Sequence, residues 1–197
     1  MDVVSYLLGK NASGGGGGGS DISKYIPYLT YSENQSIPGI LQSIKSLPSD
    51  IQILGTSLQY AFINCVGLTN IELTNTSEIT NWFATFQGCG NLQSVSLGDT
   101  SKATTFASTF LGCTKLEDVS LFDTTNVTNM SNMFRTCPAL TDVSLDNILR
   151  MCINATSYSS TQTLYALGFR STVYSIERIE ALPHYQDFVN AGWSIGY

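Results

Sequence analysis

A spaced pattern of apolar residues recurs every 24 residues and limits this chain to few folds. The pattern reads F-x-x-C-x-x-L-x-x-[IV]-x-L, and no insertion or deletion separates its copies. One copy is too short to bury its own apolar side chains, so neighbouring copies must stack to share a core. The period therefore predicts a solenoid in which equivalent residues lie above one another. The copies begin at Phe62, Phe86, Phe110 and Phe134.

Two different spacings occur within one repeat. Apolar residues at helical spacing fill the segment 127–134, and the polar residues at 123–126 are of types that cap a helix. The pattern then changes to strict alternation at Val143, Ser144 and Leu145, which is typical of a strand with one buried face. We therefore expect each repeat to contain a short helix and a short strand, with the strands forming a parallel sheet.

The period weakens at both ends of the chain, where a solenoid needs atypical repeats that seal its core. Apolar spacing at Ile148, Leu149 and Cys152 predicts one helix near the C-terminus, and the segment 175–182 predicts another. The fold class is thus α/β: a solenoid of 24-residue repeats capped at both ends. We divide the chain into an N-terminal segment with a glycine linker (1–20), an N-terminal cap (21–50), four repeats (51–146) and a C-terminal cap (147–197).

The first twenty residues do not follow the period. Six consecutive glycines at 14–19 form a flexible linker, and an apolar decapeptide precedes them. This decapeptide lacks the basic start of a signal peptide and is too short to span a membrane. Two interpretations remain open: a segment that frays or packs on its own domain, or an anchor that docks into a larger assembly. The candidate anchor residues are Val3, Val4, Tyr6, Leu7 and Leu8.

Composition argues against a nucleic-acid partner. The net charge is −6, and the nine basic residues form no run that could neutralise a phosphate backbone. Only 12% of residues are charged while 43% are hydrophobic, so the surface is polar but mostly uncharged. No segment is long and apolar enough to predict membrane insertion.

The cysteines indicate packing rather than chemistry. Four of the five occupy one repeat position, which is the interior position of the pattern, and none shows the short paired spacing of zinc ligands. We expect five buried, reduced thiols that act as small apolar groups. No metal or cofactor site is therefore predicted.

No catalytic constellation is visible, and we expect the protein not to be an enzyme. His184 is the only histidine, and neither a nucleophile elbow nor a phosphate-binding loop accompanies it. Asp99 and Asp123 share one repeat position and form either a calcium-binding ladder or backbone-bonded turns. The turn role is commoner for aspartate in such loops.

The residues between and beside the inward positions of the predicted strands point outward. These outward positions vary from repeat to repeat, whereas the inward ones do not. Such variation is expected either of a scaffold whose outer side chains bind a ligand or of a surface whose side chains drift without selection. Phe122 is predicted to be an exposed aromatic side chain within this field. The candidate ligand-binding residues are Asn70, Glu72, Ser94, Ser96, Asp118, Ser120, Phe122, Asp142 and Ser144.

The repeat closely resembles the BspA-type leucine-rich repeat of bacterial surface proteins. The residues that carry this resemblance over 51–146 are the segment 123–130 together with Met133, Phe134, Cys137, Leu140, Val143 and Leu145. The ending 191–197 looks like the terminal module of some such proteins from gut bacteria and their phages, and the opening 2–10 looks like segments of phage structural proteins. The resemblance implies a solenoid for adhesion or recognition, without enzymatic activity.

The leading hypothesis is therefore a non-enzymatic recognition or adhesion module displayed on a phage virion through its N-terminal segment. Two alternatives stay open: a bacterial cell-surface adhesin of the BspA type, and a purely structural virion component. The expected partners are a protein or glycan on a cell surface and, through residues 1–20, virion proteins. The expected location is the virion or the extracellular surface.

Overall fold

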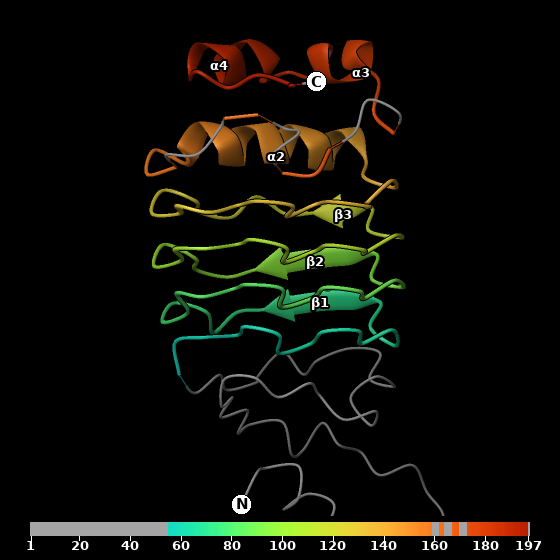
Figure 1. Cartoon of the computed structure of the whole chain (residues 1–197), viewed down its shortest axis with the longest axis vertical. Helices are drawn as coiled ribbons and strands as arrows, with labels where there is room; N and C mark the ends of the chain where they lie inside the picture. Colours follow the sequence, from blue (N-terminus) through green and yellow to red (C-terminus); the bar gives the residue numbers. More distant parts are fainter. Residues whose placement is uncertain (1–54, 159–161, 164–166, 170–172, 197) are drawn as a thin grey trace, which may run out of the picture.

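The computed structural model describes residues 55–158, 162–163, 167–169 and 173–196. The predicted anchor, glycine linker and N-terminal cap (1–50) lie outside these residues, and their roles stay predictions. The described chain forms layers stacked along one long axis, with β1 (Asn70–Leu73), β2 (Ser94–Leu97) and β3 (Asp118–Val119) in successive layers (Figure 1). Three helices follow β3: α2 (Asp142–Asn154), α3 (Ile176–Glu180) and α4 (Tyr185–Asn190).

The strands form a parallel sheet whose register equals the sequence period. The sheet order is β1-β2-β3, and Asn70 pairs with Ser94, which in turn pairs with Asp118. A second line of parallel bridges joins Ser57, Asn81, Thr105 and Asn129, again at steps of 24 residues. The prediction of a mixed helix and strand fold with a parallel sheet is confirmed. We call each 24-residue turn of the chain a coil.

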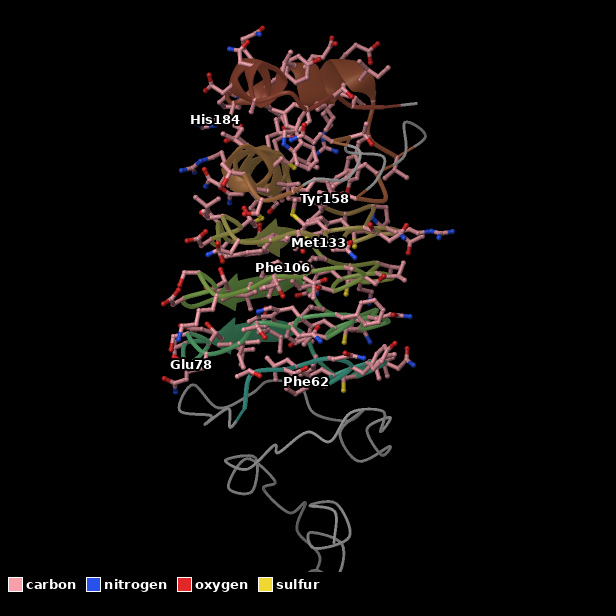
Figure 2. The ribbon with its side chains drawn as sticks, turned by 60° about the vertical axis from the view of Figure 1, so that its left-hand side comes forward. Phe62, Glu78, Phe106, Met133, Tyr158 and His184 are labelled. Carbon is pink, nitrogen blue, oxygen red and sulfur yellow. The ribbon has the colours of Figure 1, made fainter. Side chains whose placement is uncertain are left out.

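The core consists of equivalent side chains stacked from coil to coil. The rings of Phe62, Phe86, Phe110 and Phe134 are all buried, and successive centroids lie 5.4, 5.7 and 5.5 Å apart. Figure 2 shows the stacked layers with Phe106 and Met133 toward the middle and Glu78 at the edge. Burying whole aromatic rings makes these stacks a main source of the stability of the fold.

The predicted helix within each repeat is wrong. The structure forms turns but no α-helix in residues 55–141, all of which it describes. Ala84, Ser108 and Asn132 adopt the left-handed conformation, with φ of 53°, 56° and 55°. Such residues break the i to i−4 bonding of an α-helix. The backbone instead bonds to the next coil, as when the N–H of Ala84 donates to Ala107 O at 3.0 Å.

The strand predicted at Val143, Ser144 and Leu145 is also wrong, because α2 begins at Asp142. Thr141 caps this helix by accepting a hydrogen bond from the N–H of Ser144 at 3.3 Å. The apolar residues of 145–152 recur at helical spacing, and this longer period prevails over the short alternation that favoured a strand. As a consequence, Val143 lies 72% exposed instead of pointing inward.

The C-terminal layers close the stack. The two helices predicted there are present as α2 and α3, and α3 is capped by the Ser175 hydroxyl. His184, which precedes α4, holds Asp146 of α2 through its backbone N–H at 2.9 Å and its Nδ1 at 2.7 Å. None of the helices in the described part of the chain is long and apolar enough to cross a membrane.

Candidate binding surface

The outer face of the sheet carries a hollow of about 530 Å³, closed at one end by the first turns of α2. Each strand contributes alternate side chains that point away from the core, because successive residues of a strand face opposite sides. We call this feature the sheet hollow. It is lined by Asn70, Ile71, Glu72, Ser94, Val95, Ser96, Asp118, Val119, Ser120, Val143, Ser144 and Asn147.

Most of the residues predicted to bind a ligand come together in the sheet hollow. The parallel register places equivalent outward residues of β1, β2 and β3 side by side. The predicted residues that line it are Asn70, Glu72, Ser94, Ser96, Asp118, Ser120 and Ser144. Asp142 does not line it, since its carboxylate pairs with the guanidinium of Arg178 at 2.7 Å.

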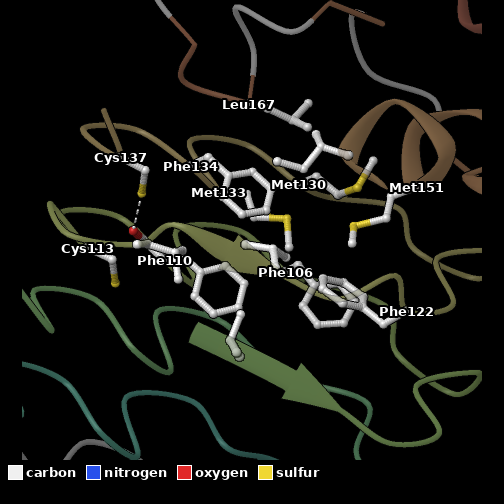
Figure 3. Close-up of a cluster of buried hydrophobic side chains, with 14 of the residues drawn as sticks. Phe106, Phe110, Cys113, Phe122, Met130, Met133, Phe134, Cys137, Met151 and Leu167 are labelled. Carbon is white, nitrogen blue, oxygen red and sulfur yellow. Dashed lines mark hydrogen bonds between the residues drawn. The ribbon is translucent and has the colours of Figure 1, made fainter. Parts of the chain in front are cut away.

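The prediction that Phe122 is an exposed aromatic residue is wrong. Only 4% of Phe122 is exposed, and its ring centroid lies 4.9 Å from that of Phe106 (Figure 3). β3 ends at Val119, so the strand alternation no longer governs the chain beyond it. Phe122 therefore turns into the core while Leu121 becomes only partly buried. A phenyl ring gains more from burial than a leucine side chain does.

Besides the inward-facing Ile71, Val95 and Val119, two residues that line the hollow were not predicted from the sequence. Val143 was expected to point inward from a strand, and Asn147 was placed in the C-terminal cap. Both line the hollow because α2 stands where a fourth strand was expected. The apolar spacing of 145–152 was the signal that revealed this helix, and extending it back to Thr141 would have placed both residues correctly.

Hydrogen bonding inside the sheet hollow is uneven. The Ser94 hydroxyl donates to Asn70 Oδ1 at 2.7 Å, and Asp118 Oδ1 accepts a long bond of 3.4 Å from Thr141. Glu72 and Ser96 make no side-chain hydrogen bond or ion pair to any residue that the structure describes. The hollow thus contains polar groups that remain available to a ligand.

The charge of the sheet hollow is negative. Glu72 and Asp118 are its two acidic residues, and no lysine, arginine or histidine is among the described residues that line it. Both carboxylates are exposed to solvent, so they act on a ligand mainly at close range. The surface therefore favours cationic or hydrogen-bonding ligands over anions.

Residues 56–163 match the family described as "Mycoplasma protein of unknown function, DUF285". This match covers more than half of the chain, including all three strands and α2. The chain belongs to the DUF285 family. The description of the family assigns it no activity.

A crystal structure of a T. pallidum leucine-rich-repeat protein is also similar, with 21% sequence identity and a TM-score of 0.39. That match covers 51% of this chain and 47% of the other, so the chain spans about half the length of the solved structure. No curated protein matches the chain. Display on a phage virion is tested by neither similarity and stays a prediction.

The five cysteines of this DUF285 chain are free and buried, as expected. Each thiol of Cys89, Cys113 and Cys137 donates to a phenylalanine carbonyl of the preceding coil, as Cys137 does to Phe110 O at 3.0 Å (Figure 3). Burial raises the pKa of Cys65, Cys89 and Cys137 to about 12. Because the thiolate is the reactive form, these residues serve packing and not chemistry.

The aspartates at the shared repeat position adopt the turn role. Asp99 Oδ1 accepts from the N–H of Ser101 at 2.9 Å, and Asp123 Oδ1 accepts from that of Thr125 at 2.8 Å. Hydrogen bonds from the backbone N–H and the side chain of Ser101 hold the pKa of Asp99 below its usual value. No cluster of metal-ligating side chains occurs among the residues that the structure describes.

Proposed function

We propose that this chain is a non-enzymatic recognition module whose ligand binds in the sheet hollow. One observation carries the proposal: outward residues from three strands and α2, distant in sequence, line a single hollow. The 24-residue register of the strands supports a leucine-rich-repeat solenoid as the scaffold. Stacked coils present such residues on a rigid backbone, which suits specific binding.

The side chains of the hollow suit binding better than catalysis. Its hydroxyls belong to serines, and a serine becomes a nucleophile only beside an activating base. The single histidine, His184, is engaged by Asp146 and does not line the hollow. Amides, hydroxyls and carboxylates at fixed spacing are instead the groups that give hydrogen-bonding specificity to a ligand site.

The partner that we propose is a protein or glycan on a cell surface, which places the module in adhesion, as in BspA-type proteins. The support is the contrast between conserved inward positions and varied outward ones within this single chain. At equivalent positions, Leu73 and Leu97 are both buried, whereas Glu72 and Ser96 are both exposed and differ in charge. A scaffold that varies only its outer residues can acquire a ligand without altering its core.

A binding array of cell-surface proteins and glycans tests this proposal with the full chain. The Ser96→Trp variant places a bulky ring in the middle of the hollow, and Ser77→Trp places the same ring on an exposed turn outside it. We expect at least one array component to bind the wild type and Ser77→Trp but not Ser96→Trp. Binding that survives in Ser96→Trp, or no binding by the wild type, contradicts the proposal.

A further inference from the structure

We propose that the sheet hollow accepts an extended, basic peptide segment of a partner protein, with a lysine or arginine side chain held by Glu72. This inference rests on the proposed function, because it specifies the ligand class of the same hollow. Three features carry it: a carboxylate without a described ion-pair partner, the lack of cations among the described residues that line the hollow, and the length of the row of polar groups.

The carboxylate of Glu72 is exposed on β1 and has no ion-pair partner among the described residues. Some carboxylates of the stack are neutralised internally, since Glu78 pairs with Lys102 at 2.7 Å and Asp142 pairs with Arg178 at 2.7 Å, whereas others outside the hollow, such as Glu117, have no ion-pair partner among the described residues. Glu72 differs from those other unpaired carboxylates because it lines the hollow together with the polar side chains of Asn70 and Ser96. A lysine or arginine side chain of a partner would supply the positive charge that pairs with Glu72.

The second carboxylate of the hollow, Asp118, strengthens this preference. It lies on β3, two strand spacings or roughly 10 Å from β1, and receives one long hydrogen bond of 3.4 Å from Thr141. Among the residues that the structure describes, no lysine, arginine or histidine lines the hollow to attract an anion. An acidic or phosphorylated ligand would face two like charges, so the field selects basic ligands.

The length of the hollow fits a short stretch of extended chain. From β1 past β3 to α2 is three layer spacings, or roughly 14 Å, and an extended peptide advances about 3.3 Å per residue. About four residues therefore span it. The Ser96 hydroxyl stands midway without a described partner and can both donate to a peptide carbonyl and accept from an N–H.

The far end of the hollow offers an apolar contact. Val143, in the first turn of α2, is 72% exposed and lines the hollow beside Ser144. A single exposed valine is common on protein surfaces, but Val143 lies at the end of the hollow opposite Glu72. A peptide with a basic residue at the β1 end and an apolar residue at the α2 end would contact both Glu72 and Val143. None of the described residues that line the hollow is aromatic, so they offer no stacking surface to the flat faces of sugar rings.

Amide NMR titration of the isotope-labelled full chain tests this proposal with three probes: tetralysine blocked at both ends, blocked tetraglutamate, and maltotetraose. We expect tetralysine alone to shift signals of 70–73, 94–97, 118–119 and 142–147 in a saturable manner. Glu72→Gln should weaken its affinity about 3–10-fold, and added salt should weaken it further. Glu117→Gln is the matched control, since it removes the same charge at an exposed residue outside the lining.

Each other outcome overturns the basic-peptide proposal. If tetralysine binds elsewhere, or if Glu117→Gln weakens it as much as Glu72→Gln does, Glu72 is not its partner. If maltotetraose or tetraglutamate binds the hollow instead, the ligand class is wrong while the proposed function stands. If no probe shifts these signals, the basic-peptide proposal also fails, and the array experiment with Ser96→Trp decides separately whether the hollow binds anything.

Discussion

The hydroxyl of Ser144 replaces a strand as the partner of Val119. Ser144 Oγ accepts a hydrogen bond from the N–H of Val119 at 2.9 Å and donates one to Glu117 O at 2.8 Å. Asn147 of α2 adds a third bond by donating to Val119 O at 3.0 Å. A sheet edge normally exposes such groups as a template for aggregation, and here helical side chains cover them.

We predict that Ser144→Ala lowers the free energy of unfolding by about 1–3 kcal/mol, because it leaves the buried N–H of Val119 without its partner and removes one of the donors to Glu117 O. Ser120→Ala is the matched control at the equivalent position one coil earlier. The Ser120 hydroxyl is buried without a described partner, so its removal should be neutral or slightly stabilising. Urea denaturation of both variants measures the difference, and equal effects would contradict this account of the edge.

We predict that Gly98→Ala is destabilising whereas Gly90→Ala is not. A Cβ at Gly98 would lie 2.5 Å from the carbonyl oxygen of Thr74, and the backbone must shift to relieve this contact. Overpacking of this kind costs about 1–3 kcal/mol. A Cβ at Gly90 meets nothing nearer than 3.7 Å, and the residue needs no unusual φ. Thermal unfolding compares the two; a Gly98→Ala variant as stable as Gly90→Ala would show that these coils are less tightly stacked than described.

The sequence period was sufficient to predict the stacked core, since a fixed interval forces Phe62 over Phe86 and Leu73 beside Leu97. It also placed most residues of the sheet hollow, because parallel register brings equivalent outward positions together. It did not predict the left-handed turns, because left-handed residues such as Ala84 and Ser108, one per coil at the same position, leave no trace in the spacing of apolar residues. Phe122 was misplaced because β3 ends at Val119, and Val143 was misplaced because the repeat pattern continues in the sequence into the first turn of α2.

We predict that Phe122→Ala lowers the free energy of unfolding by about 3–5 kcal/mol, as is typical when a buried phenylalanine is truncated. Its ring packs against Phe106 and does not line the hollow, so ligand binding by the folded fraction should not change. Phe83→Ala is the control, since that ring is only partly buried and should cost less. Denaturation midpoints test the prediction, and a Phe122→Ala variant with wild-type stability would contradict the burial of this ring.

We predict that stability falls as the pH rises above about 9. Burial raises the thiol pKa of Cys65, Cys89 and Cys137 from 9.0 to about 12, so the folded state keeps protons that the unfolded chain releases. The contribution of these thiols to the free energy of unfolding is therefore complete below pH 9 and is lost as the pH rises toward 12. Each such thiol adds a slope of about 1.4 kcal/mol per pH unit.

Urea denaturation between pH 8 and 10 measures this slope, and Cys89→Ala is the informative variant because it should flatten the profile by one thiol. Native protein should also resist thiol reagents at pH 8 until it is unfolded. A stability that does not change across this range, or rapid labelling of the native protein, would contradict the burial of the thiols.

The central claim is that the sheet hollow is where this chain recognises its partner. Hydrogen–deuterium exchange of the full chain, with and without the array component that it binds, tests this claim most directly. We predict slower exchange at 70–73, 94–97, 118–119 and 142–147, with little change in the turns around Ser77 and Ser101. Protection confined to those turns or to α3 and α4, with no change across the three strands, would contradict it.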